Sequence, residues 1–225
     1  MSPLSPFAAG RRLARARDGI AAVEFALVFP VMALLFMGSF EVTSMLMADL
    51  KLTTAADTAA DLVGQLAYNA TTNSANWAPT DFANFTTAAE VVMTPLPIAA
   101  NQLKIAYAGI TYTTGQAVLD WHVEANGATA LTLSSIPPAM IAANLINSNA
   151  LDSLIVVNAQ YTYASPTTYF LTAASYTLSE WSVYRPRYVN CVAVLTTPTP
   201  AASSPPALAT PSISVTALNA TGVCP

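Results

Sequence analysis

The chain has 225 residues, of which 54% are apolar and only 9% are charged. Because ordinary soluble domains carry about 25% charged residues, this composition is unusual for a cytosolic protein. The net charge of −4 is unevenly placed, with +3 on the first nineteen residues and −7 on the rest. No basic patch remains beyond the first nineteen residues, so we expect no nucleic-acid surface.

Residues 1–19 form a polar, basic leader without a helical pattern, and its positive charge comes from Arg11, Arg12, Arg15 and Arg17. Arginines beside a membrane span stay on the cytoplasmic side. We therefore expect a cytoplasmic N-terminus and a C-terminal domain on the far side. Arg11-Arg12 also fits a twin-arginine signal, but no export cleavage site accompanies it.

A long helix is expected from Ile20, with a transmembrane part over residues 20–47. The uncharged run Phe25–Phe40 has sixteen residues and covers only about 24 Å, so the span must extend beyond it at one end. Pro30 lies inside the run and removes one helical hydrogen bond, which predicts a kink or a loosened turn.

Residues 48–68 predict an amphipathic extension of that helix. One helical face carries an alanine-rich seam, defined as Leu52, Ala56, Ala59, Val63 and Leu66. The seam can face a partner subunit or pack on this chain's own domain, and the sequence leaves both readings open.

Residues 69–80 are expected to form a linker, and the stretch "PTDFANFTTAAEVVM" predicts a helix capped by Thr80 or Asp81. Its predicted apolar face is Phe82, Phe85, Ala89 and Val92. "QLKIAYAGITYT" and "QAVLDWHVEA" predict a β-hairpin around Thr114-Gly115. "IPPAMIAANLI" predicts a helical turn, "SLIVVNAQYTYA" a strand, and "YTLSEWSVYRPRYVNCVAV" a last strand bent at Pro186.

Residues 196–225 are uncharged and rich in Pro, Thr and Ala, which predicts a loosely ordered tail. The two cysteines, Cys191 and Cys224, lie late in the chain. On an oxidising side of the membrane they could form a disulfide closing a loop of about 33 residues. Two unpaired thiols remain the alternative.

The hairpin also carries Asp120, His122 and Glu124 at alternate positions, so a metal site is geometrically conceivable. An exposed polar face opposite Trp121 and Val123 explains the same alternation, and we expect no metal site. No nucleophile, dinucleotide or phosphate-binding motif occurs. We expect no catalytic residue, no cofactor and no small-molecule substrate.

Six late tyrosines offer side chains suited to an interface, although packing of strands on the helix explains some of them equally well. They are Tyr161, Tyr163, Tyr169, Tyr176, Tyr184 and Tyr188. The sequence does not decide which of them face outward.

The segment "RARDGIAAVEFALVFPV" is the most informative motif. A secretory signal has its cleavage site after the apolar core, and here no clear site of that kind follows it. The arrangement fits cleavage before the core, after Gly19, which would make Ile20 the new N-terminus. Glu24 and Phe25 would then be the fifth and sixth residues.

These features resemble the class III signal of type IV pilin-like proteins, and more specifically TadE-like pseudopilins of the tight-adherence (Flp-type) pilus system. The matching residues are Arg15, Arg17, Gly19, Glu24 and Phe25. The resemblance is strongest over Arg15–Leu35. "TTAADTAADLVGQ", "SLIVVNAQYTYASP" and "YRPRYVNCV" also resemble later parts of such proteins.

The resemblance implies a bacterial inner-membrane protein cut at Gly19–Ile20 by a prepilin peptidase, with other pilin-like or pilus assembly subunits as partners. Glycine suits a tight peptidase pocket. In an assembly Glu24 could pair with the terminal amine of a neighbouring subunit, so that misassembly would leave a charge unpaired. Alternatively, Glu24 merely lies at the headgroup level.

We therefore expect an α+β fold: a long N-terminal transmembrane helix and, over residues 81–195, a TadE-like periplasmic domain with an antiparallel sheet and short helices. The expected role is a minor pilin or pseudopilin that supports pilus assembly. The alternatives are an unprocessed single-span envelope scaffold of the same machinery, or an exported soluble domain.

Overall fold

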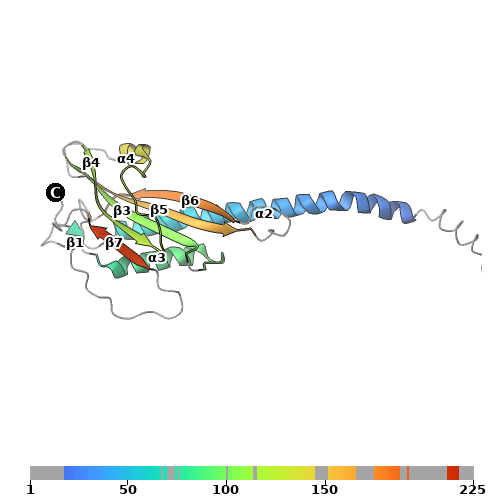
Figure 1. The fold of residues 1–225 in the computed structure, drawn as a ribbon, viewed down its shortest axis with the longest axis horizontal. Coiled ribbons are helices and arrows are strands. Elements are labelled where there is room, and N and C mark those ends of the chain that lie inside the picture. The colour runs from blue at the N-terminus through green and yellow to red at the C-terminus, as the bar shows by residue number, and fades with distance from the viewer. Residues whose placement is uncertain are drawn as a thin grey trace, which may run out of the picture. The chain divides into compact units, whose positions relative to one another are not determined.

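The computed structural model describes residues 18–66, 68–69, 74–75, 77–99, 101–113, 116–144, 152–165, 175–187, 192 and 212–217 (Figure 1). Its chain divides into two compact units, Met1–Met45 and Leu46–Pro225. Helix α2, Asp18–Gly64, contributes residues to both units. The first unit is described from residue 18 onward and consists there of this helix alone.

The second unit contains a five-stranded antiparallel sheet in the order β6-β5-β3-β4-β7. The strands are β3 (Leu103–Thr113), β4 (Gln116–Ala125), β5 (Asp152–Ala164), β6 (Ser175–Tyr184) and β7 (Ile213–Ala217). The apolar helix followed by this sheet and short helices confirms the predicted α+β fold. The hairpin and the strand over "SLIVVNAQYTYA" are confirmed as β3, β4 and β5.

Four smaller elements complete the described part of the unit. Helix α3, Pro79–Met93, lies beneath the sheet in Figure 1, and α4, Pro138–Asn144, is the predicted helical turn. Strands β1 (Tyr68–Asn69) and β2 (Ser74–Ala75) form a two-residue ladder. Tyr68 was expected to end the helical extension, which instead ends at Gly64, and the other three residues lie in the expected linker.

The N-cap of α3 differs from the prediction. The cap residue is Ala78, and Asp81 instead lies in the first turn, where its Oδ2 accepts a 2.7 Å hydrogen bond from the Ala78 backbone N–H. Proline is favoured at the first position of a helix because its missing N–H would have no partner there. Pro79 therefore starts the helix one residue before Thr80, and the carboxylate of Asp81 secures the start from inside the first turn.

One face of the sheet packs on the helices. Phe82 of α3 contacts Tyr107 and Trp121 with ring centroids 5.0 and 5.6 Å apart, and all three side chains are fully buried. On the other side of the same face, Ser182 donates a 2.7 Å hydrogen bond to Asp57 of α2. Two helices thus cover this face, α3 over β4 and α2 over β6.

The opposite face is covered by the segment between β4 and β5. Leu131 packs with Ala106 and Ala108 of the central strand, while Ile136 packs with Ile110, Leu154 and Val156. Trp181 of β6 borders both clusters. Both faces of β3 and β5 are therefore buried, which explains their near-continuous apolar sequences.

The last part of the chain departs from two predictions. Strand β6 ends at Tyr184, before the expected bend at Pro186, and it is followed by another strand. Residues 213–217, expected within a loosely ordered tail, form β7 and pair with β4. Five alternating, β-branched or small residues, "ISVTA", suffice for an edge strand because β4 supplies the partner.

Candidate functional site

The processing motif lies at the start of α2, which begins at Asp18. Gly19 and Ile20 are exposed, and a Cβ added at Gly19 would meet no atom within 4 Å. Glu24 is also exposed and lies four residues after Ile20, so the two share one helical face. The fold itself does not require a glycine at position 19.

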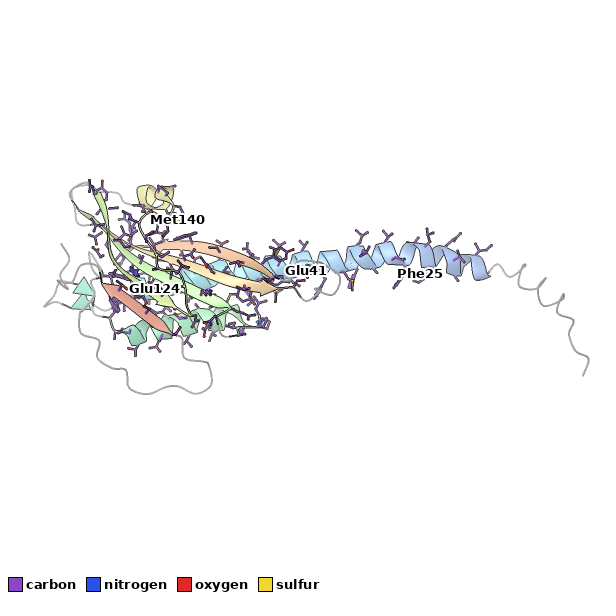
Figure 2. The ribbon with its side chains drawn as sticks, viewed as in Figure 1. Phe25, Glu41, Glu124 and Met140 are labelled. Carbon is purple, nitrogen blue, oxygen red and sulfur yellow. The ribbon has the colours of Figure 1, made fainter. Side chains whose placement is uncertain are left out.

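Apolar side chains surround this motif on every side of the helix. Phe25 packs on Phe29 with ring centroids 5.5 Å apart, yet both side chains are more than half exposed (Figure 2). One eighteen-residue window of α2 has a mean hydropathy of 2.4, with none of it buried. Other exposed apolar residues in the same stretch are Ile20, Val23, Leu27, Val31, Met32, Leu34, Leu35 and Phe36.

The predicted disturbance at Pro30 does not interrupt the helix. The proline lies inside α2, which continues through it to Gly64. Loss of the hydrogen bond to the carbonyl of Ala26 is thus accommodated within one helix. Proline is tolerated in membrane helices because neighbouring groups can satisfy the freed carbonyl.

Two groups of predicted residues lie outside the described part of the chain. These are the topology-determining arginines Arg11, Arg12, Arg15 and Arg17, and the cysteines Cys191 and Cys224. The membrane orientation inferred from the arginines and the disulfide between the two cysteines remain predictions.

The alanine-rich seam packs on this chain's own domain. Leu52, Ala56, Ala59 and Val63 are at most 1% exposed, and Leu66 is 9% exposed. Ala48, Ala55 and Ala60 extend the same buried surface. The reading in which the seam faces a partner subunit is therefore wrong, because the sheet already covers it.

Lys51 connects this helix to the end of α3. Its ammonium group donates hydrogen bonds to the backbone carbonyls of Val92, at 3.2 Å, and Thr94, at 2.5 Å. These carbonyls lie at the C-terminus of a helix, where the macrodipole favours a positive charge. Lys51 thus provides a cation for a helix that has no basic residue in its own last turn.

The predicted face of Asp120, His122 and Glu124 is divided by a β-bulge. Gly109 pairs with Trp121 and Ile110 pairs with Leu119, which leaves Asp120 as the extra residue of β4. Asp120 accepts a hydrogen bond from Thr111, on the face that packs on the helices. His122 and Glu124 contact each other on the opposite face, so the bulge separates Asp120 from them.

The expectation that His122 and Glu124 form an exposed polar face is also wrong. Their side chains are only 14% and 11% exposed. Glu124 is labelled in Figure 2, on β4 beside β7. Among the described residues, no group of three or more His, Cys, Asp or Glu side chains could hold a metal ion.

A buried polar cluster, which the sequence did not reveal, lies where β4 ends. Asn126, in the left-handed region with φ of 56°, donates through its side-chain amide to Glu90, at 2.9 Å, and to the Leu103 carbonyl, at 3.0 Å. Its backbone N–H donates to the Ser212 carbonyl at 2.9 Å. Asn126 thereby joins α3, β3 and the start of β7. The one available signal was the Asn-Gly pair after a strand, which predicts a turn.

Burial raises the pKa of the Glu90 carboxyl, while the hydrogen bond from Asn126 acts in the opposite direction. Glu90 is only 5% exposed. Burial also raises the pKa of Glu180 on strand β6, and the charges of Asp49 and Asp57 raise that pKa further.

The late tyrosines divide into buried and exposed residues. Tyr161 and Tyr163 are 1% and 4% exposed, so they belong to the core rather than to an interface. Tyr161 donates to the Pro97 carbonyl at 2.9 Å. Tyr176 is 42% exposed and Tyr184 is half-buried, while Tyr169 and Tyr188 lie outside the described residues.

The described residues contain one apolar helix long enough to cross a membrane, followed by a small α+β domain, and this order suggests a membrane-anchored, single-span protein. Residues 19–61 match the family model described as TadE-like protein. This match confirms the predicted resemblance over that segment. No curated protein and no solved structure matches the chain. The resemblance of the later strands lies outside the matched segment.

Proposed function

We propose that the protein is a non-enzymatic minor pilin or pseudopilin that supports assembly of a tight-adherence pilus. The observation that carries this proposal is the motif Gly19-Ile20 with Glu24 and Phe25. It lies at the start of the exposed apolar part of α2, in the TadE-like segment. The four arginines before Gly19 favour a cytoplasmic N-terminus in the bacterial inner membrane and a periplasmic sheet domain.

Cleavage by a prepilin peptidase is the first step of this proposal. Gly19 is exposed and has open space at its Cβ position, so neither packing nor backbone conformation of the described chain explains a glycine there. A peptidase pocket without room for a side chain does explain it. Cleavage after Gly19 would leave a positively charged amine on Ile20, one helical turn from Glu24.

The second step is the role of that amine in assembly. A carboxylate in hydrocarbon is costly unless it is paired. Glu24 lies in the first turns of an exposed apolar helix, where a neighbouring subunit's terminal amine can approach it. Pairing would stabilise one register of neighbouring helices and penalise others.

An unprocessed envelope scaffold of the same machinery is the second candidate. One observation favours it: α2 starts at Asp18, so the bond between Gly19 and Ile20 lies in the first helical turn. A peptidase that needs an extended substrate would have to unwind this turn. The third candidate, an exported soluble domain, would require cleavage beyond Gly38, within the helix.

The N-terminal residue of the protein isolated from membranes tests all three candidates. A start at Ile20 supports prepilin-type processing. A start at Met1 or Ser2 supports the scaffold, and a start beyond Gly38 together with a soluble product would refute membrane anchoring. Gly19→Ala is the matched variant, because the structure has room for the added methyl group while a tight peptidase pocket does not.

A further inference from the structure

Strand β7 is joined to the rest of the sheet at one edge. It pairs with β4 over five residues, from Ala125 opposite Ile213 to Trp121 opposite Ala217. Within the described residues no strand pairs with its other side. Helix α3 also contacts β7. Among the described residues, the strand pairing of β7 is thus a single short ladder.

Some contacts that hold the receiving edge do not involve β7. Trp121 of β4 packs on Phe82 of α3, with ring centroids 5.6 Å apart. The backbone N–H of Asn126 donates to the carbonyl of Ser212, just before β7. The side-chain amide of Asn126 is held by Glu90 and by the Leu103 carbonyl. Neither the ring contact nor these side-chain hydrogen bonds involve residues 212–217. The ring contact of Trp121 and the side-chain hydrogen bonds of Asn126 can therefore form equally well when the incoming strand comes from another copy of the chain.

The connection to β7 is long in sequence. Residues 193–211 separate Val192 from Ser212, and they contain five prolines and no charged residue. A chain of that length can reach at most about 65 Å. That reach exceeds the width of a small domain. Nothing in the length of the connection restricts β7 to its own sheet.

We propose that β7 exchanges between copies of this chain, so that β7 of one copy pairs with β4 of a second copy. A second copy is the favoured partner because its residues 213–217 can form the same five residue pairs with β4 that form within one chain. Exchanging identical elements between protomers costs little free energy because the same contacts form. When copies are concentrated in a membrane or an assembly, the effective concentration of a second copy's β4 rises. This favours pairing between copies over pairing within one chain.

The exchange gives the sheet domain an interaction surface that goes beyond the proposed function. It requires neither cleavage at Gly19 nor pairing of Glu24. Backbone hydrogen bonds of the ladder would supply affinity, and the Asn126 anchor would fix the register. A chain that failed to exchange strands could still be a pilus assembly subunit.

A mixed-chain disulfide experiment tests the exchange. Two differently tagged full-length chains, both carrying Cys191→Ser and Cys224→Ser, are expressed together in membranes. One carries Glu124→Cys and the other Ser214→Cys, because these residues are directly opposite in the ladder. Mild oxidation should give a cross-linked heterodimer on a non-reducing gel. The matched control replaces Ser214→Cys with Ile213→Cys, whose side chain points to the other sheet face.

The result expected is a heterodimer yield several-fold above that of the control pair. A chain carrying both Glu124→Cys and Ser214→Cys reports the pairing within one copy. Efficient cross-linking within that chain, with no heterodimer above the control, would overturn the proposal, since β7 would then stay on its own sheet. Failure of both cross-links would contradict the ladder itself and overturn the proposal with it.

Discussion

The indole of Trp121 lies directly across the backbone of Gly109, at the point where β4 carries its bulge. A Cβ added at Gly109 would overlap the indole nitrogen and lie 2.8 Å from its Cζ2 atom. The indole N–H donates a 2.6 Å hydrogen bond to the Val192 carbonyl, so the ring is held from both sides. Gly109 is therefore a steric requirement of the core.

Gly109→Ala should destabilise the sheet domain by about 3 kcal/mol or more, because the indole must leave its buried position. Denaturant unfolding of the detergent-solubilised protein, followed by tryptophan fluorescence, measures the change. Gly38→Ala is the control, since an added Cβ there meets no atom within 4 Å. Equal unfolding midpoints for the two variants would refute the steric role of Gly109.

Glu90 should make the stability of the domain depend on pH. Because its pKa is raised in the folded state, the carboxyl contributes stability that is present below its ordinary value of 4.5 and is lost as the pH rises through the folded pKa. Glu90→Gln should remove this loss while still accepting the hydrogen bond from Asn126. Unfolding midpoints of wild type and variant, compared from about pH 5 to about pH 8, test this.

A second substitution at the same site separates charge from hydrogen bonding. Glu90→Ala removes the acceptor of the Asn126 amide and should destabilise the domain at every pH, by about 1–3 kcal/mol. If Glu90→Gln were as unstable as Glu90→Ala at neutral pH, the burial of a charged carboxylate would not be the source of the pH dependence.

Lys51→Met should weaken the end of α3 by about 1 kcal/mol, because two terminal carbonyls lose a charged donor. Methionine retains much of the apolar stem of lysine, so packing changes little. Amide hydrogen exchange in the last turn of α3 should accelerate. Lys104→Met, which changes the same charge on strand β3, should leave exchange in that turn unaltered.

Glu24→Ala should leave membrane insertion intact and reduce pilus assembly, if the carboxylate pairs with a neighbour's terminal amine. Carbonate extraction measures insertion, and counting pili on cells measures assembly. Val23→Ala is the neighbouring control, because Val23 is 69% exposed and carries no charge. Normal piliation of the Glu24→Ala strain would instead support a residue that merely lies at the headgroup level.

The sequence predicted those parts of the fold whose periodicity is regular. The β-branched and aromatic run of β5 and the apolar run of α2 identified their elements, and the four-and-three spacing identified the buried seam of α2. Spacing alone did not say what covers that seam, because an alanine-rich face packs equally well on a sheet or on another subunit. The structure resolved this through the burial of Ala56 and Ala59.

The remaining features of the sheet were not predicted because the strand pairing is irregular. One inserted residue, Asp120, shifts the register of β4, so strict alternation placed three polar side chains on one face when the bulge divides them. Gly109 opposite Trp121 was the available signal of a close approach within the strand. The short strand β7 lacked any local signal beyond five suitable residues, because its formation depends on an edge far away in the sequence.

The pairing of β4 with β7 has a consequence for the order in which the chain is made. Trp121, Val123 and Ala125 leave the ribosome long before their partners at positions 213–217. During that interval the backbone groups of the β4 edge lack the ladder that later satisfies them, and such edges are prone to pair with other chains. Chains truncated before Ile213 are therefore expected to aggregate or to be degraded, even though every other strand described here is already complete.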